Sequence, residues 1–230
     1  MYRASIFDVD GTLVDSNDAH ANAWVQAIAD SGGRVELSRV RPLIGMGGDK
    51  VIPQLTGLAA DSPEGKAIAD KRGEIFKRDF LPHLKPTRGA QQLLEWLRDD
   101  RKALVIASSA REDELRGLLE IAGASRLIES TTSSDDAEHS KPDPDIVAVA
   151  IRRTGCPAGE VIMVGDTPYD VEAALRAGID IIGVRCGGWR DEELHGAIAV
   201  YADPADLLER YDLSPFRRPA PARRVPPPSA

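Results

Sequence analysis

Two carboxylates near the amino terminus decide how the rest of this chain is interpreted. Residues 5–16 read Ser-Ile-Phe-Asp-Val-Asp-Gly-Thr-Leu-Val-Asp-Ser, with the pair at Asp8 and Asp10. The short apolar run before Asp8 is typical of a buried strand, so both carboxylates are expected at the strand's carboxyl end, where they can share one small site. Two negative charges this close repel unless they share a proton or a cation neutralises them. The pattern therefore predicts a site for an oxygen-preferring cation such as Mg²⁺, and it leaves one aspartate free to act as a nucleophile.

The same residues allow two other interpretations. Aspartates in a turn often do no more than accept hydrogen bonds from backbone amides. The string Asp-x-Asp-Gly also occurs in calcium-binding loops, which a glutamate closes six residues after the glycine. The residue at that distance from Gly11 is Asn17, which disfavours a calcium loop.

Length, composition and charge limit the class of protein. The 230 residues are 42% hydrophobic but only 5% aromatic, so aliphatic side chains must fill the core. A formal charge of −8, spread along the chain, disfavours nucleic-acid and membrane-surface partners. Neither a leader nor an apolar run of about 18 residues is visible, which favours a cytoplasmic location. Cys156 and Cys186 lack ligand spacing and are expected to be reduced thiols in the core.

Strand-like and helical patterns alternate along most of the chain, which predicts an α/β fold with a Rossmann-like parallel sheet between helices. Strands are expected at residues 3–7, 103–107, 161–164 and 179–184. Helices are expected at residues 91–98, 112–123, 145–153, 170–177 and 203–211. Ligands of such folds bind beyond the carboxyl ends of the strands.

Residues 17–84 interrupt this alternation with helical patterns alone, at residues 19–30, 48–57 and 64–80. An all-helical block inserted after the first strand predicts a second, smaller domain that covers the site. The predicted domains are an α/β core at residues 1–15 and 85–213 and a helical cap at residues 16–84. Hinges are expected near residues 15–16 and 82–87. Residues 214–230 are rich in proline and arginine and are expected to form a disordered tail.

Three further segments place polar groups at the ends of predicted elements. Ser108 and Ser109 follow the second strand, where hydroxyls and free helix amides suit phosphate oxygens, although serine is also an ordinary helix cap. Lys141 lies next to a proline before a helix, and its charge would offset that of a nucleophile and of phosphoryl oxygens. Asp166 and Asp170 follow the third strand, where they could bind the same cation or cap the next helix.

These segments together resemble the haloacid dehalogenase-like superfamily of phosphohydrolases. The resemblance is strongest to the branch with a helical cap after the first strand, which includes phosphoglycolate phosphatases and β-phosphoglucomutases. Four motifs occur in the family's order, and the resemblance covers residues 1 to about 212. The motifs are Asp8-Val9-Asp10-Gly11-Thr12, Ser108, Lys141 and Gly165-Asp166 with Asp170.

The resemblance implies catalytic roles for several of these residues. Asp8 would be the nucleophile that accepts the phosphoryl group. Asp10 would protonate the leaving group and then deprotonate the attacking water. Ser108 would donate a hydrogen bond to the phosphoryl oxygens, Lys141 would offset their charge, and Ser109 would orient its neighbours at the substrate.

The resemblance also implies a magnesium site. Its ligands would be the Asp8 carboxylate, the backbone carbonyl of Asp10 and the Asp166 carboxylate. Asp170 would support this site, either as a metal ligand itself or by contacting a ligand. Thr12 would orient neighbouring groups at the substrate through its hydroxyl or its amide.

Substrate contacts are expected from the cap. The glycine-rich loop at residues 41–48 resembles a specificity loop of phosphoglycolate-phosphatase-like proteins, and Gly45 lets backbone approach a ligand closely. Arg41 and Arg72 are candidates for binding a substrate carboxylate or a second anionic group. His20 is either a substrate-sensing residue or an ordinary helix residue.

The sequence therefore predicts a Mg²⁺-dependent phosphatase that hydrolyses a small phosphorylated metabolite through an aspartyl-phosphate. One alternative is a sugar-phosphate mutase similar to β-phosphoglucomutase, although Gly165 stands where such mutases commonly have glutamate. Another is a catalytically weak binding relative that uses the arginine-rich tail. Phosphoglycolate, sugar phosphates and nucleotides all remain open as substrates, and the oligomeric state is not specified.

Overall fold

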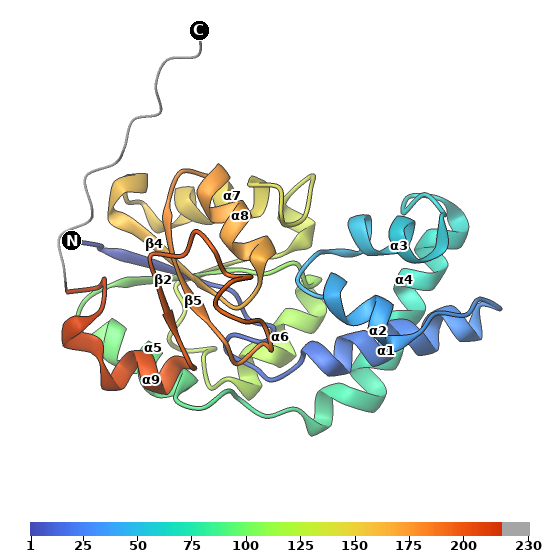
Figure 1. Cartoon of the computed structure of the whole chain (residues 1–230), viewed down its shortest axis with the longest axis horizontal. Coiled ribbons are helices and arrows are strands. Elements are labelled where there is room, and N and C mark those ends of the chain that lie inside the picture. The colour runs from blue at the N-terminus through green and yellow to red at the C-terminus, as the bar shows by residue number, and fades with distance from the viewer. Residues whose placement is uncertain (218–230) are drawn as a thin grey trace, which may run out of the picture.

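The computed structural model describes residues 1–217, and a six-stranded parallel sheet forms the centre of this part of the chain (Figure 1). The strand order is β3-β2-β1-β4-β5-β6, which places the amino-terminal strand inside the sheet. The strands are β1 (Ala4–Phe7), β2 (Ala103–Ala107), β3 (Ser130–Thr132), β4 (Val161–Gly165), β5 (Asp180–Val184) and β6 (Ala199–Tyr201). β1 pairs with both β2 and β4 and is buried on both faces, which fits its mainly apolar sequence Ala-Ser-Ile-Phe.

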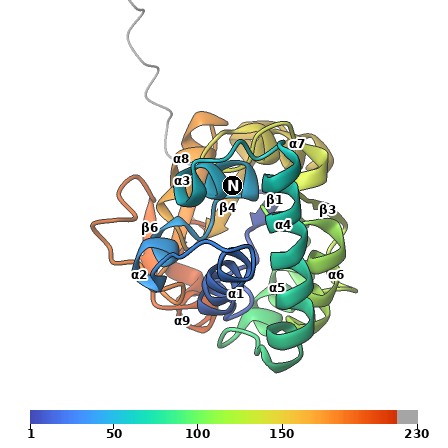
Figure 2. The ribbon, with the colours of Figure 1, turned by 90° about the vertical axis from the view of Figure 1, so that its right-hand side faces the viewer.

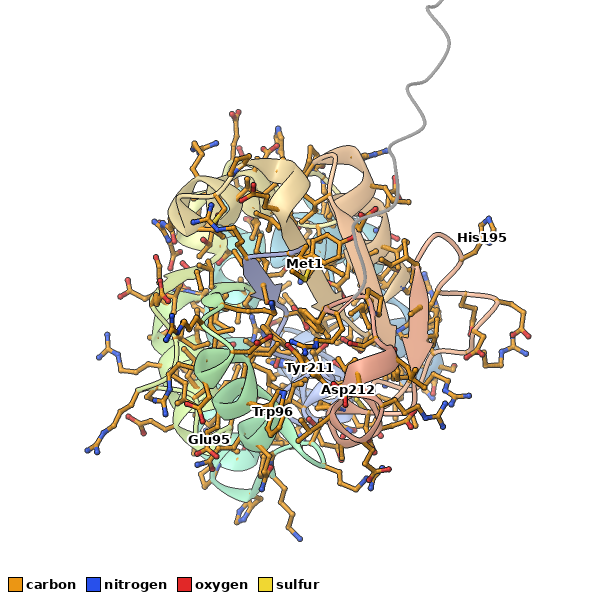
Figure 3. All side chains as sticks on the ribbon, turned by 90° about the vertical axis from the view of Figure 1, so that its left-hand side faces the viewer. Met1, Glu95, Trp96, His195, Tyr211 and Asp212 are labelled. Atoms are coloured by element: carbon orange, nitrogen blue, oxygen red, sulfur yellow. The ribbon has the colours of Figure 1, made fainter. Side chains whose placement is uncertain are left out.

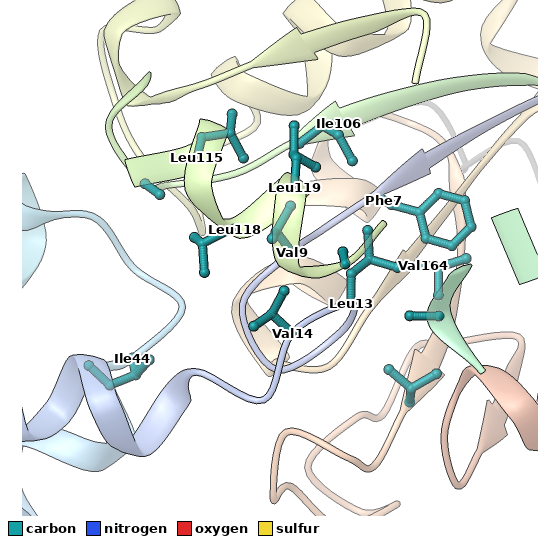
Figure 4. Packing of buried hydrophobic residues seen from close by; sticks show 14 of the residues in the cluster. Phe7, Val9, Leu13, Val14, Ile44, Ile106, Leu115, Leu118, Leu119 and Val164 are labelled. Atoms are coloured by element: carbon teal, nitrogen blue, oxygen red, sulfur yellow. The ribbon is translucent and has the colours of Figure 1, made fainter. Parts of the chain in front are cut away.

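Helices cover both faces of the sheet, and successive residues of β1 face opposite layers. The helices that cover the sheet are α5 (Ala90–Asp99), α6 (Glu112–Ile121), α7 (Asp145–Thr154), α8 (Pro168–Arg176) and α9 (Pro204–Glu209). Ile6 packs into the apolar layer that contains residues of α7 and α8, whereas Phe7 packs into the layer with α5, α6 and α9. In Figure 4, Phe7 lies beside Val164, and the α6 residues Leu115, Leu118 and Leu119 belong to the same cluster. The core is thus mainly aliphatic, as the composition indicates.

A helical cap lies beyond the carboxyl ends of the strands and faces the viewer in Figure 2. Its helices are α1 (Asn17–Asp30), α2 (Leu37–Val40), α3 (Gly48–Thr56) and α4 (Pro63–Ile75), which continues as a π-helical turn (Phe76–Phe80) and a 3-10 turn (Leu81–His83). Further 3-10 turns are Arg41–Leu43, Ser134–Asp136, Ala158–Glu160 and Tyr211–Leu213. The predicted fold class, a Rossmann-like parallel sheet with an inserted all-helical cap, is confirmed. The exact domain boundaries stay a prediction.

The two chain crossings between the sheet and the cap lie side by side and form a neck, residues 13–15 and 85–87. The amide of Asp15 donates to the carbonyl of Lys85 at 3.0 Å, and the amide of Thr87 donates to the carbonyl of Leu13 at 3.0 Å. The Thr87 hydroxyl donates to the carbonyl of Thr12 at 2.7 Å. This pairing joins the base of the cap directly to the loop that carries Asp10.

The predicted disordered tail does not begin at Ser214. Phe216 is fully buried and stacks on Tyr211, with ring centroids 5.8 Å apart, and the Ser214 hydroxyl donates to the Tyr211 carbonyl at 2.6 Å. Tyr211 lies beside Trp96 of α5 at the end of the molecule remote from the cap (Figure 3). The expectation is therefore wrong for residues 214–217, because an aromatic side chain gives this segment something to bury. Residues 218–230, the rest of the predicted tail, lie outside the described residues.

No helix within residues 1–217 has the length and apolar character needed to cross a lipid bilayer.

Candidate active site

Three carboxylates and one lysine meet where β1 and β4 end. Asp8 directly follows β1, Asp166 directly follows β4, and Asp170 lies in the first turn of α8. Each offers an oxygen atom within 4.8 Å of the others, and all three side chains are buried. Lys141, in the loop before α7, donates from Nζ to Asp8 Oδ1 at 2.5 Å and to Asp170 Oδ1 at 2.7 Å. The parallel sheet thus brings together residues that are up to 162 positions apart in the sequence.

One lysine does not balance three buried carboxylates. Burial raises the pKa of Asp8 well above its usual range, with Lys141 acting against this rise and the neighbouring aspartates adding to it. Burial and the charge of Asp170 raise the pKa of Asp166 to about 7. Burial by itself lowers the pKa of Lys141, but Asp170 and Asp8 more than offset this effect, so the lysine keeps its charge. The cluster therefore holds more negative charge than its protein neighbours neutralise.

Hydrogen bonds hold Asp166 and Asp170 in different ways. Asp166 accepts from the Thr12 hydroxyl at 3.0 Å and from Asn17 Nδ2 at 2.9 Å. Asp170 accepts from Lys141 and also from the amide and hydroxyl of Thr167, with which it forms the capping box of α8. Asp170 therefore orients Lys141, whereas the two hydrogen bonds to Asp166 come from neutral donors.

This donor set fits a hard divalent cation. Carboxylate oxygens are the ligands that Mg²⁺ prefers, and a bound cation removes the repulsion that raises the pKa values of Asp8 and Asp166. Asp8 and Asp166 are the carboxylates best placed to hold it, because Asp170 already accepts three hydrogen bonds within the protein.

Asp10 points to a different set of neighbours. Its Oδ1 accepts from the Ser16 hydroxyl at 2.5 Å and lies 2.7 Å from His20 Nε2, while the His20 ring stacks on Phe76 at 3.9 Å. Burial by itself would raise the pKa of Asp10, but His20 and then Ser16 outweigh it and lower the pKa. The two aspartates of the first motif therefore differ in protonation behaviour, although both line the same cavity.

That cavity, about 40 Å³ in volume, lies between the sheet and the cap. Besides Asp8 and Asp10 it is lined by the predicted residues His20, Ser109 and Gly45. The Ser109 hydroxyl donates to the Gly45 carbonyl at 3.1 Å and so ties the glycine-rich loop of the cap to the end of β2. Gly45 has a φ of +112°, and a Cβ there would approach Thr167 to 2.8 Å, which explains why this close approach needs glycine.

The other predicted site residues take supporting positions. Ser108 is buried, and its hydroxyl accepts from the Ala110 amide at 3.0 Å, which orders the turn before α6. Arg41 does not line the cavity, because it is held by Asp18 at 2.6 Å and by the Gly187 carbonyl at 2.6 Å. Arg72 does line the cavity.

Asn17 is a site residue that the sequence interpretation missed. Its Nδ2 also donates to the Gly187 carbonyl at 3.2 Å, so Asn17 connects the start of α1 to two loops of the core. The contact to Asp166 spans 149 positions. Nothing in the local sequence marks such a residue, because its role depends on how the cap sits on the sheet.

The chain belongs to the haloacid dehalogenase-like hydrolases. The model of this family, described as haloacid dehalogenase-like hydrolase, matches residues 5–184, a span that contains all four motifs. The chain is therefore a hydrolase-type enzyme of this family.

Two curated relatives and one solved structure illustrate the similarity. The chain is 30% identical over 195 residues to a probable phosphatase, IndB, of Dickeya dadantii (strain 3937), covering 84% of this chain and 85% of the relative. It is 28% identical over 209 residues to a phosphoglycolate phosphatase of Pseudomonas syringae pv. syringae (strain B728a), covering 89% and 75%. The crystal structure of a hydrolase from Pseudomonas syringae superposes with a TM-score of 0.85 at 30% identity, covering 91% of this chain and 98% of that one.

Proposed function

We propose that this protein is a Mg²⁺-dependent phosphatase that hydrolyses a small phosphorylated metabolite through an aspartyl-phosphate on Asp8. The observation that carries the proposal is the buried cluster of Asp8, Lys141 and Asp166 beside a cavity that Asp10 also lines. Phosphoryl transfer depends mainly on in-line placement and on neutralisation of charge, and this cluster supplies both kinds of group. Mg²⁺ held by Asp8 and Asp166 would neutralise charge on the phosphoryl oxygens.

Asp8 is the proposed nucleophile. Lys141 donates to Asp8 Oδ1, which leaves Oδ2 to attack phosphorus while the ester P–O bond breaks. Lys141 favours the ionised form of Asp8 against the effect of burial and also lies where phosphoryl oxygens would arrive. Ser108, at the end of β2, is the proposed hydroxyl contact to those oxygens.

Asp10 is the proposed acid and base. It would protonate the leaving oxygen in the first step and accept a proton in the second, from the water that attacks the aspartyl-phosphate. His20 Nε2, 2.7 Å from Asp10 Oδ1, lowers the pKa of Asp10 and is the proposed neighbour that positions its carboxylate. An arriving phosphate anion favours protonation of Asp10 in turn.

The relatives support the class of substrate rather than its identity. The probable phosphatase of Dickeya dadantii and the phosphoglycolate phosphatase of Pseudomonas syringae are both named for phosphatase activity, and the second for a small organic phosphate. The small volume of the cavity above Asp8 also favours a small phosphate ester.

The test is phosphate release from a panel of phosphorylated metabolites and p-nitrophenyl phosphate, with Mg²⁺ or with EDTA. We expect release with Mg²⁺, its loss with EDTA, and a loss of at least about 10³-fold in Asp8→Asn, because the nucleophile is removed. Asp99→Asn is the matched control, since Asp99 is an exposed aspartate at the end of α5. Equal release by the wild type and Asp8→Asn would refute the proposal. Movement of phosphate within a sugar, without release, would replace it with a mutase.

A further inference from the structure

A buried ion pair joins the cap to the core at the wall of the active-site cavity. Arg72 of α4 donates from Nη1 to Glu114 Oε2 of α6 at 2.7 Å. The two residues are only 8% and 1% exposed, and both line the cavity that contains Asp8 and Asp10. The Arg72 guanidinium also lies over the ring of Trp24, 5.1 Å from its centroid. The proposed chemistry uses neither member of this pair.

Each member of the pair keeps one polar atom without a partner. Arg72 Nε and Glu114 Oε1 are buried and make no hydrogen bond within residues 1–217. Buried polar atoms in folded proteins are nearly always hydrogen-bonded, and leaving one unsatisfied is costly. Because both residues line the cavity, a molecule bound there is the natural source of the missing partners.

The chemistry of the two atoms specifies the partner. Arg72 Nε–H can only donate a hydrogen bond, and Glu114 Oε1 can only accept one. A carboxylate would satisfy the arginine but repel the glutamate, and an ammonium group would do the reverse. A hydroxyl group donates and accepts, so one hydroxyl or two neighbouring ones satisfy both atoms without adding charge to a pair that is already neutral.

The space beyond the pair suits a substrate with several hydroxyls. A larger pocket of about 490 Å³ adjoins the cavity and shares Trp24, Gly48, Arg72 and Ser109 with it. The ion pair is therefore situated between the phosphoryl site and a volume of the size that small-molecule pockets have. A leaving group that extends from the cavity into this space would pass Arg72.

We propose that Arg72 and Glu114 form a hydroxyl-recognition site, so that the enzyme selects a phosphorylated sugar or polyol over a phosphorylated carboxylic acid. This inference rests on the proposed phosphatase activity and adds the substrate class to it. The pair donates hydrogen bonds to hydroxyls of the leaving group and accepts hydrogen bonds from them, while Asp8 and Asp10 act on the phosphoryl group.

The experiment compares kcat/KM for sorbitol 6-phosphate, phosphoglycolate and p-nitrophenyl phosphate. The wild type is expected to prefer sorbitol 6-phosphate to phosphoglycolate by about 10-fold or more, since a site built to bond hydroxyls discriminates strongly against groups that leave it unpaired. Glu114→Gln removes the charge and is expected to lower this preference by about 10-fold, chiefly through KM of the polyol phosphate. Turnover of p-nitrophenyl phosphate, which has no hydroxyl on its leaving group, should change little.

A double variant and a control separate recognition from a structural role. Arg72→Met with Glu114→Leu leaves no buried charge unpaired, so it is expected to fold and to lose the preference. Asp113→Asn breaks the exposed Lys77–Asp113 pair, which joins the same two regions one residue away but does not line the cavity, and it should keep the preference.

Two results would overturn the inference: a wild type that prefers phosphoglycolate, or variants that lose activity equally on all three substrates. Absence of phosphate release from every substrate, p-nitrophenyl phosphate included, would instead refute the proposed phosphatase activity.

Discussion

At the scale of single residues, Asp8 and Asp10 carry the same side chain two positions apart and acquire opposite properties from their neighbours. Burial beside Asp170 and Asp166 raises the pKa of Asp8, with Lys141 opposing. The pKa of Asp10 is lowered in spite of burial, because His20 and Ser16 contact its carboxylate. Pairs of titratable groups whose pKa values are pushed apart are what a nucleophile and an acid–base group require.

Replacement of His20 tests this division at Asp10. His20 contributes most among the groups that lower the pKa of Asp10, ahead of Ser16 and Lys141, so His20→Gln is expected to raise that pKa. The limb of the pH–rate profile that belongs to Asp10 should then move to higher pH, together with a fall in kcat. The measurement is kcat and kcat/KM for p-nitrophenyl phosphate across pH 4–9, with His83→Gln, an exposed histidine of the cap, as control. A profile that stays in place would show that His20 does not tune Asp10.

At the scale of elements, helices and strands can be predicted where hydrophobic periodicity and the order of segments along the chain determine them. The strand at residues 103–107 is observed at the same bounds, and the helix predicted from residue 112 begins there. β3 and β6 were missed because three residues are too few to show alternation, and α4 changes to a π-helical turn at Phe76, which its periodicity does not reveal. The helix predicted from residue 19 begins two residues earlier, at Asn17, and no side chain caps it.

The contacts of the site also fall into some that the sequence predicts and some that it does not. Asp8 and Asp166 could be predicted to meet because parallel strands end at one edge of a sheet, and the family resemblance places Lys141 with them. The contacts of Asn17 with Asp166 and of Arg72 with Glu114 could not, because each joins the cap to the core and no pattern in the chain encodes where the cap comes to rest. Arg41 was expected at the substrate for its charge alone, but Asp18 and Gly187 engage it.

Substitution of two glycines, Gly11 and Gly57, distinguishes the cost of backbone strain from the cost of a steric clash. Gly11 and Gly57 have similar positive φ values, +80° and +74°, but only Gly11 is crowded: a Cβ there would lie 2.2 Å from Asn17 Nδ2 and 2.3 Å from Asp166 Oδ2. Gly57→Ala is expected to cost about 1 kcal/mol of unfolding free energy from backbone strain alone. Gly11→Ala should cost roughly 3 kcal/mol or more and displace Asp166. Urea denaturation of both variants is the measurement, and equal losses would mean that the loop after β1 can rearrange freely.

At the scale of the whole molecule, the structure is a closed form. The cavity above Asp8 is small, the neck is paired on both crossings, and the Lys50–Asp143 and Arg111–Asp70 pairs join the cap to the core at 2.5 Å and 2.7 Å. Because these contacts hold the cap against the core, we expect turnover to require movement of the cap. In the proposed reaction, exclusion of water in the closed form would protect the aspartyl-phosphate until the attacking water enters.

Covalent closure of the cap tests this requirement. A carbodiimide forms an amide between a lysine and a carboxylate in contact, and Lys50 with Asp143 meets that condition across the cap and the core. Phosphate release is expected to fall in proportion to the fraction of Lys50–Asp143 cross-link found by peptide mass spectrometry. Lys50→Arg keeps the charge but cannot form this amide, so the same treatment should leave that variant more active and thereby account for reaction at other carboxylates. Because the cross-link fixes the contacts already seen in the closed form, full activity of the linked enzyme would mean that substrate enters by a route other than cap opening.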